Sequence, residues 1–349
     1  MILGIESSCD ESALAVFDPQ YGIIRETVFS QEQYHQNYGG VVPDIASRSH
    51  LEKFPIILKP FLENINLATI DLIAFTAGPG LVASLAMGQT FAKTLSWLWN
   101  RPLRAVNHLS GHLYSPFINK HRQNPSDFNG KISKHYLPHL GLLVSGGNTL
   151  LFEINRKQTV NILADTVDDA AGEALDKGAK LLGLSYPGGR RIEHLALGGD
   201  AERYKFPESF KSINDWKFSF SGLKTSLRYF LEKKKCCQWN DKLKQDLCAS
   251  YQKAVFSVLI NKFKQAIKSR PYNSAGLSGG VGNNLKLRQS FIEVSKQNGV
   301  APLLPDPQHT GDNAAMVAFS AWVTEESRRK SNTEDTSIKP VWNLSNQSE

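Results

Sequence analysis

Two histidines four residues apart, His108 and His112, are the side chains whose types and spacing point most directly to chemistry. They follow an apolar run, residues 103–106, that is typical of the end of a strand. If a helix begins there, both imidazoles lie one turn apart on the same face. Two ring nitrogens at that spacing can share one metal ion, each about 2.1 Å from it. The alternative is a pair of histidines packed in a core or at a helix start, the commoner use of a bare His-x-x-x-His pattern.

Leu109 stands where zinc peptidases of the His-Glu-x-x-His type carry their glutamate base. The pattern therefore predicts a metal site that lacks the base for peptide hydrolysis. A third ligand must come from elsewhere in the chain. Asp312 begins the last predicted helix, which it can cap, and it is also the candidate third ligand.

The composition of the chain limits its class. With 349 residues and 41% hydrophobic content, it can bury a sizeable core and is expected to form two domains. The N-terminus has no basic flank or long apolar run, and no apolar stretch is long enough to span a bilayer, so we expect a cytoplasmic protein without a signal peptide. The four cysteines form no disulfide framework, which suits a reducing compartment. The net charge of +7 permits an acidic partner such as nucleic acid without requiring one.

The elements that must position these side chains form a repeated pattern. Residues 2–5 and 13–17 are apolar runs separated by a polar turn at 6–12, which predicts strand, turn, strand. Such a turn can hold a phosphate or a metal-bound oxygen, and an ordinary hairpin loop is the equal alternative. Residues 139–154 repeat the pattern, which indicates a duplicated architecture. Two such halves facing each other would place both polar turns in one cleft, near the histidines.

Between the two repeats, the sequence predicts a helix over 43–62, a strand over 71–76 and a helix over 81–99. The glycine-rich corner at 77–80 lacks the lysine and the spacing of a P-loop. A helix start can bind phosphate. At this corner, however, the sequence favours close packing of the helix on the strand.

A polar region at 120–136 predicts the domain boundary. An N-terminal domain is expected over 1–125, completed by a helix over 312–328, and a C-terminal domain over 136–311. The polar tail at 329–349 is expected to be disordered.

Further polar residues in the second half offer binding groups. Asp176 lies two turns into a predicted helix that begins near residue 168, and the macrodipole explains the first acids of that helix but not this one. A glycine-rich turn at 278–284 links a strand to a helix, and an asparagine at that helix mouth can bond a sugar hydroxyl or a base. Basic residues are frequent at 233–270. The default interpretation is a solvent-exposed face of a helix, and the more specific alternative is a nucleic-acid-binding surface.

Seven motifs follow one another along the chain: GIESSCDE at 4–11, YGGVVP at 38–43, TAGPGL at 76–81, HLSGH at 108–112, LVSGG at 143–147, DDAAGE at 168–173 and DNAAM at 312–316. With these motifs the chain resembles the bacterial tRNA adenosine threonylcarbamoyltransferases, the universal family once labelled O-sialoglycoprotein endopeptidase. The resemblance extends from residue 1 to about residue 328. A single motif can arise by chance, whereas all seven in this order are specific.

The resemblance implies an α/β fold of the actin/Hsp70-like type, with two duplicated RNase H-like domains and a nucleotide cleft between them. It implies an acyltransferase that moves the threonylcarbamoyl group from threonylcarbamoyl-AMP to N6 of adenosine 37 in tRNAs reading ANN codons, releasing AMP. It also implies partners: a smaller inactive paralogue and an ATPase of the same pathway. We predict that helices 43–62 and 81–99 form part of the paralogue contact.

The family motifs assign roles to residues of this chain. By this resemblance His108, His112 and Asp312 are the ligands of one iron(II) ion, with zinc as the alternative. Asp10 and Glu11 match an acidic pair facing the metal region, where they would help to deprotonate or orient the incoming amine. The remaining matches are substrate-binding positions: Leu143, Val144, Ser145, Gly146 and Gly147 beside the phosphate and acyl group, and Asp176, Gly189, Glu193 and Asn284 around the adenosine.

Two other function classes stay open on the sequence. A metal-dependent glycopeptidase, the activity in the old family label, is disfavoured by Leu109; the third class is an inert nucleotide-binding scaffold. The chain also departs from the family at Asn148, where many relatives carry histidine after Ser-Gly-Gly. Residues 282–284, Gly-Asn-Asn, also differ from the Ala-Asn-like motif of the family. Asn283 is therefore the alternative to Asn284 for the adenosine-binding role.

Overall fold

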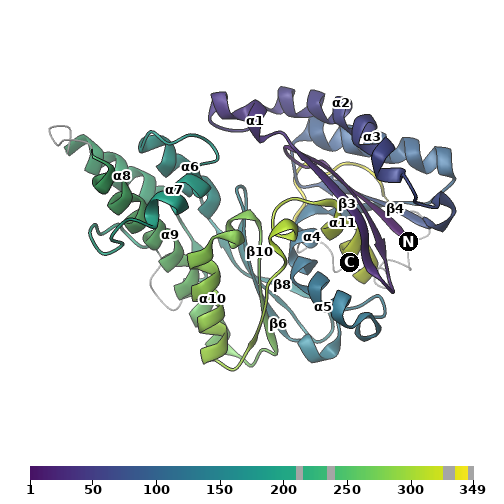
Figure 1. The fold of residues 1–349 in the computed structure, drawn as a ribbon. Helices are drawn as coiled ribbons and strands as arrows, with labels where there is room; N and C mark the ends of the chain where they lie inside the picture. Colours follow the sequence, from purple (N-terminus) through teal and green to yellow (C-terminus); the bar gives the residue numbers. More distant parts are fainter. Residues whose placement is uncertain (210–214, 234–239, 325–334, 345–349) are drawn as a thin grey trace.

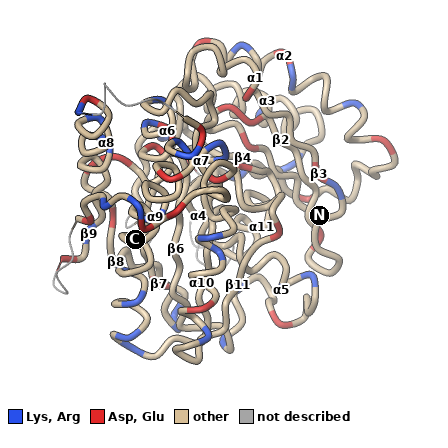
Figure 2. The backbone as a smooth tube through the Cα atoms, turned by 60° about the vertical axis from the view of Figure 1, so that its left-hand side comes forward, with Lys and Arg blue, Asp and Glu red and all other residues tan. Residues whose placement is uncertain are grey.

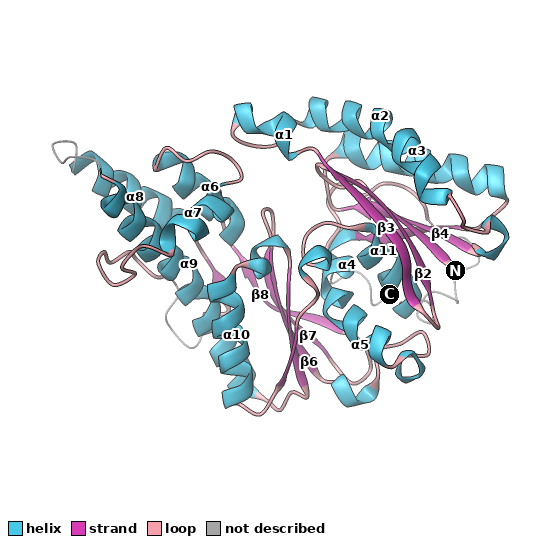
Figure 3. Ribbon diagram, in the orientation of Figure 1, coloured by secondary structure: helices cyan, strands magenta, loops and turns pink. Residues whose placement is uncertain are grey.

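The computed structural model describes residues 1–209, 215–233, 240–324 and 335–344 (Figure 1). Two mixed sheets form the framework, one in each half of the described chain. Figure 3 shows helices packed beside both sheets, with α2 and α3 along one face of the first. The predicted α/β class is therefore confirmed.

The first sheet has five strands in the order β3-β2-β1-β4-β5. The first three are antiparallel neighbours, and β4 and β5 run parallel to β1. Every residue of β1 is buried, because helices cover both faces of the sheet. The strands are β1 (Ile2–Glu6), β2 (Glu11–Asp18), β3 (Gly22–Ser30), β4 (Leu72–Gly78) and β5 (Leu103–Asn107).

The second sheet repeats this topology. Its strands lie in the order β11-β10-β6-β7-β8-β9. The hairpin partners β7 and β8 are antiparallel, and β10 and β11 run parallel to β6. The duplication predicted from residues 2–17 and 139–154 is therefore confirmed at the level of strand order. The strands are β6 (His139–Val144), β7 (Thr149–Ile154), β8 (Val160–Thr166), β9 (Lys217–Phe218), β10 (Ser274–Ser278) and β11 (Ala301–Leu303).

The helices of the first half divide between its two faces. The predicted helix at 43–62 is α2 (Pro43–Leu62), which packs on α3 (Val82–Trp99). The opposite face carries α4 (His108–Tyr114) and α11 (Ala314–Val323), whose ten residues are all buried. A helix that is apolar on all sides must be enclosed. Two short helices, α1 (Glu32–His35) and α5 (Ile118–Gln123), complete this half.

The enclosure of α11 comes from the second half. One buried cluster joins Leu113 of α4 and Val317 of α11 to Leu143 and Phe152 of the second sheet. The two halves therefore share a core on the side that carries α4.

The core of the second half is built around α9 (Asp241–Ser269), a helix of 29 residues. Tyr251 in α9 is fully buried, and its hydroxyl donates a hydrogen bond of 2.9 Å to the Ala174 carbonyl. This bond satisfies a polar group inside an apolar cluster. The surrounding helices are α6 (Ala171–Leu181), α7 (Gly188–Ala196), α8 (Ser221–Lys233) and α10 (Leu285–Gln297).

Two regions expected to be irregular carry buried anchors. The polar region 120–136 inserts Phe128, Ile132 and Tyr136 into the shared core, so it is not an exposed linker, and the domain limits drawn there stay a prediction. The expectation of a disordered tail is wrong for residues 335–344, which lie against β4 and bury Leu344. The rest of that tail lies outside the described residues. Over the part of the chain that the structure describes, no helix has the length and apolarity needed to cross a membrane.

The buried imidazole of His139 predicts acid sensitivity. Burial lowers the pKa of His139 to about 3, well below its value of 6.5 in an unfolded chain. Stability is therefore retained above pH 6.5 and is lost as the pH falls from 6.5 toward 3. Between pH 7 and pH 5 the free energy of unfolding should fall about 2 kcal/mol more in the wild type than in His139→Asn. Denaturant titrations at both pH values measure the difference, and equal pH dependence would contradict it.

Candidate metal and substrate site

The predicted helix after residue 107 begins where the sequence places it. Asn107 ends β5, and its Oδ1 accepts hydrogen bonds from the backbone N–H groups of Leu109, at 2.9 Å, and Ser110, at 3.3 Å. This side-chain cap starts α4 at His108. All seven residues of α4 are buried, so both histidines are held in fixed surroundings.

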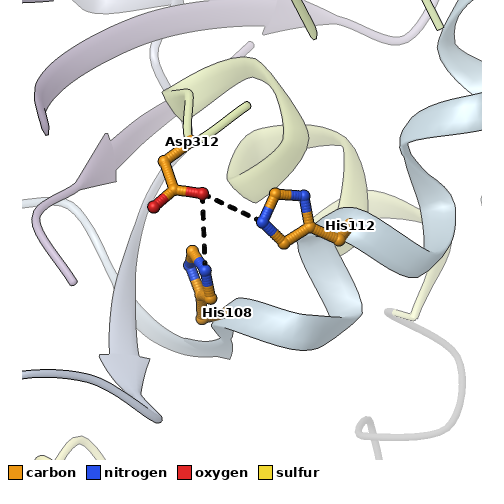
Figure 4. Close-up of side chains that lie close together, drawn as sticks. All are labelled: His108, His112 and Asp312. Atoms are coloured by element: carbon orange, nitrogen blue, oxygen red, sulfur yellow. Dashed lines mark hydrogen bonds and ion pairs between the residues drawn. The ribbon is translucent and has the colours of Figure 1, made fainter. Parts of the chain in front are cut away.

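His108, His112 and Asp312 converge, as Figure 4 shows. The Asp312 Oδ1 atom lies 3.0 Å from His112 Nε2 and 3.6 Å from His108 Nε2. One ligand atom from each residue lies within 4.8 Å of the other two. A tetrahedral ion with bonds of about 2.1 Å needs ligand atoms about 3.4 Å apart, so the group fits one metal ion.

Asp312 is free for this contact because a neighbouring residue caps the last helix. The cap of α11 is Asn313, whose Oδ1 accepts from the N–H of Met316 at 2.9 Å. The expectation that Asp312 itself caps the helix is therefore wrong. The short amide of Asn313 fills that position, which leaves the Asp312 carboxylate directed at the histidines.

The charges of the group compensate one another. Burial opposes protonation of His108, but the carboxylates of Asp312 and Glu6 outweigh it and raise the pKa of His108 to about 9. Burial also opposes ionisation of Asp312, yet His108 and His112 lower the pKa of its carboxyl to about 2. A metal ion binds only neutral imidazole, so an entering ion must displace the His108 proton.

Glu6 is a residue of this site that the sequence interpretation missed. Its carboxylate is fully buried at the end of β1 and lies 3.2 Å from His108 Nδ1. The same carboxylate accepts hydrogen bonds from the Thr76 hydroxyl, at 2.5 Å, and the Ser8 N–H, at 2.6 Å. A carboxylate on Nδ1 fixes the ring and leaves Nε2 for the metal. The only sequence signal was one acid closing an otherwise apolar strand.

The predicted acidic pair lies beside this group. Asp10 precedes β2, and Glu11 is its first residue. Burial, with the nearby carboxylates of Asp10 and Asp312, raises the pKa of Glu11 well above its usual value. Glu11 therefore retains a proton at a pH where an exposed glutamate would lose it.

The loop predicted from Leu143 to Gly147 divides into two parts. Leu143 and Val144 are buried in β6, so only their backbone can meet a ligand. Ser145 and the two glycines form the turn to β7, and a Cβ on Gly146 or Gly147 would meet open space. The Ser145 carbonyl accepts from the Gly172 N–H at 3.3 Å, which brings the turn against the start of α6.

The four residues assigned to the adenosine lie in α6, in α7 and at the start of α10. The Asp176 carboxylate in α6 accepts from the Gly189 N–H in α7 at 3.1 Å, and burial raises the pKa of Asp176. Glu193 in α7 accepts from the N–H of Leu285, the first residue of α10, at 2.8 Å. Asn284 caps that helix, and its Nδ2 donates to Gln252. The contacts of Asn284 are thus structural, and its role toward a ligand stays a prediction.

Tyr186, which precedes α7, lies near both the acidic pair and Asp176, and the sequence interpretation missed it as well. Burial raises the pKa of its phenol, and so do the charges of Asp10, Asp176 and Glu11. Tyr186 therefore lies close to carboxylates from both halves. An ion pair of 3.3 Å between Arg190 in α7 and Glu32 in α1 further joins the halves on this side.

This arrangement defines an actin/Hsp70-like fold with a histidine–aspartate group beside its first sheet. Solved structures share the fold: HypF of T. kodakarensis matches with a TM-score of 0.60 at 14% identity, over 93% of this chain and 48% of that chain. A full-length HypF in a phosphate- and nucleotide-bound form matches with a TM-score of 0.55 at 13% identity, over 96% of this chain and 56% of that chain.

The family follows from sequence comparison. A family model described as tRNA N6-adenosine threonylcarbamoyltransferase matches residues 22–319. A relative of that name from Thermosipho melanesiensis is 41% identical over 325 residues, covering 92% of this chain and 94% of its own. Another from Dichelobacter nodosus is 39% identical over 348 residues, covering 99% and 96%. The chain belongs to the family of tRNA N6-adenosine threonylcarbamoyltransferases.

The contact between Glu6 and His108 predicts a specific loss of metal affinity. Glu6→Gln keeps the size of the side chain and removes its charge, so the affinity for added Fe²⁺ or Zn²⁺ should fall about 10- to 100-fold. Calorimetric titration of the metal-free protein measures this. The matched control is Glu153→Gln, a buried acid paired with Arg270 away from the site, which should bind metal like the wild type. Equal affinity in Glu6→Gln would contradict the assigned role.

Proposed function

We propose that this chain forms N6-threonylcarbamoyladenosine on tRNA, with His108, His112 and Asp312 as the metal-binding group of the reaction. The single observation that carries the proposal is the convergence of these three side chains beside Glu11, in a chain whose relatives bear the transferase name. Neither relative bears a peptidase name, and Leu109 stands where peptidases of the His-Glu-x-x-His type carry their glutamate.

The proposed donor is threonylcarbamoyl-AMP, a mixed anhydride that is already activated. The chain therefore needs no covalent nucleophile and must hold the donor carbonyl close to N6 of the acceptor adenosine. The turn at Ser145–Gly147 offers backbone N–H groups and open space for the phosphate and acyl part. Asp176 and Glu193 offer carboxylate oxygens to ribose hydroxyls.

The proposed ion is iron(II), with zinc as the alternative. When bound, it supplies a Lewis acid that stabilises negative charge developing on oxygen. Two imidazoles and one carboxylate suit either ion and leave coordination positions open for substrate. The His–Glu6 contact orients one of those imidazoles.

Proton handling falls to the acidic pair. N6 of adenosine must lose a proton as it forms the new C–N bond of a urea, while the bond from the carbamoyl carbon to the AMP phosphate oxygen breaks. Burial and the carboxylates of Asp10 and Asp312 raise the pKa of Glu11, so its carboxylate is a stronger base than that of an exposed glutamate and suits a group that takes up this proton. Asp10, one residue earlier in the same turn, would orient the amine.

Binding of tRNA does not need a groove that opens a duplex. The proposed target adenine lies in the single-stranded anticodon loop, where unpaired bases are accessible. Figure 2 shows Lys and Arg spread over several elements and mixed with acids. Within 233–270, Lys242 and Lys253 pair with acids and Lys262 is buried, so these three lysines already have partners or packing within the fold.

The outer helices of the first half suit the proposed paralogue contact. Leu51 and Ile56 in α2 are 66% and 63% exposed, and Trp97 and Leu98 in α3 are 82% and 60% exposed. Exposed apolar side chains concentrated on two packed helices mark an interaction site. We therefore place the smaller paralogue on α2 and α3, with the pathway ATPase as a further partner.

Loss of a metal ligand tests the proposed reaction. His112→Ala should lower the rate of modification by about 100-fold or more, because the Lewis acid contributes several kcal/mol to transition-state stabilisation. The assay combines the protein, its partners, threonylcarbamoyl-AMP and unmodified tRNA, followed by nucleoside mass analysis. His135→Ala, an exposed histidine bonded to Ser133, is the control and should retain full activity. Undiminished modification by His112→Ala would refute the proposed role of the metal site.

The paralogue surface has its own test. Trp97→Asp places a charge where an apolar side chain would be buried, so the affinity for the paralogue should fall at least about 10-fold. Tyr229→Asp, at an exposed aromatic residue of α8, should bind like the wild type. Sedimentation of mixtures of the two proteins measures the complex. An intact complex with Trp97→Asp would place the contact elsewhere.

A further inference from the structure

Residues 335–344 pass over the carboxyl ends of β4 and β5, the edge of the first sheet that carries the candidate metal site. The Lys339 N–H donates to the Ala77 carbonyl at 2.7 Å, and the Gly80 N–H donates to the Pro340 carbonyl at 3.2 Å. The segment therefore continues the hydrogen bonding of β4 beyond the sheet. A Cβ on Gly78 would clash with the Lys339 carbonyl, which explains a glycine at that corner.

Two apolar side chains anchor the segment. Leu344 is 4% exposed and belongs to the buried cluster that contains Leu109 and Leu113 of α4. Trp342 packs against a second cluster, on the other side of the sheet, that contains Leu95 of α3. Val341, which precedes Trp342, is 84% exposed, and Asn343, between the two anchors, is also exposed. The buried and exposed positions thus alternate as in a strand laid on a surface.

The segment reaches His108 through the cap of α4. The Trp342 carbonyl accepts from Asn107 Nδ2 at 3.2 Å. With its Nδ2 held in this way, the Asn107 side-chain amide presents its Oδ1 to α4. That oxygen accepts the hydrogen bonds from the N–H groups of Leu109 and Ser110. The residue between the cap and those N–H groups is His108.

A second connection runs through the glycine corner. Gly80, held by Pro340, precedes Leu81, whose N–H donates to the Ser8 carbonyl at 2.8 Å. The Ser8 hydroxyl lies 3.2 Å from His108 Nδ1, the ring nitrogen that also meets Glu6. The segment is therefore connected to both the backbone and the ring of His108 without touching a metal ligand.

We propose that residues 335–344 form a positioning element that fixes α4 and holds His108 ready for metal binding. The inference rests on the proposed metal site. It assigns a role to a polar, proline-containing stretch that has no catalytic side chain of its own. The element acts through Asn107 and Ser8, so its removal should loosen the site while leaving every ligand in place.

The test uses the full chain with Trp342→Ala and Leu344→Ala combined, and Val341→Ala as the matched control. Loss of both anchors should accelerate release of bound Zn²⁺ to a chelator about 10-fold. It should also accelerate hydrogen exchange at the Leu109 and Ser110 amides, which depend on the Asn107 cap. The control should match the wild type in both measurements. A synthetic peptide of residues 335–344, added in excess, should restore slow release.

The outcomes separate the two proposals. If the double variant unfolds at a lower temperature but keeps wild-type zinc release and wild-type exchange in α4, the segment only adds stability and the inference is overturned. If the wild type itself binds no zinc or iron, the metal proposal fails, and exchange in α4 alone decides the positioning role. Should the double variant not fold, Leu344→Ala alone is judged by the same two measurements.

Discussion

The compensation of charge around His108 is the interaction on which the rest of the site depends. Two carboxylates, the fully buried Glu6 and the partly buried Asp312, are brought to opposite nitrogens of one buried imidazole. An unpaired carboxylate there would be strongly unfavourable. Positive charge at that position, on the protonated ring or on a metal ion, therefore stabilises both carboxylates. The site is built to hold positive charge before any substrate arrives.

The fold supplies these partners from distant parts of the sequence. Glu6 ends the central strand β1, His108 begins the helix after β5, and Asp312 lies just before α11. Parallel strands bring their carboxyl ends to the same edge of a sheet, which is why β1 and β5 can present neighbouring side chains. The second half contributes the turn after β6 and the starts of α6, α7 and α10. The proposed ion and nucleoside positions thus come from the same edge of two copies of one topology.

The sequence predicted what depends on local pattern and missed what depends on long-range contact. The helix from Pro43 to Leu62 was located to the residue, because its proline start and apolar period are local signals. The pairing of His108 with His112 follows from helical spacing. The role of Glu6 does not, because its partner lies 102 residues away. The order in residues 335–344 was missed for a related reason, since the hydrogen bonds that fix its backbone and its two apolar anchors, Trp342 and Leu344, meet residues far away in the sequence.

The course of the chain just before α11 has a mechanical consequence. After β11 the chain leaves the second sheet, and His309 bonds to Glu26 of β3 at 2.9 Å before the chain reaches Asp312. The chain is therefore fixed to the first half three residues before Asp312, and α11, which follows, packs on the first sheet. Because α4 belongs to the same half, all three side chains of the group are held by one half of the molecule. Their relative positions thus depend on contacts within that half and not on the angle between the two halves.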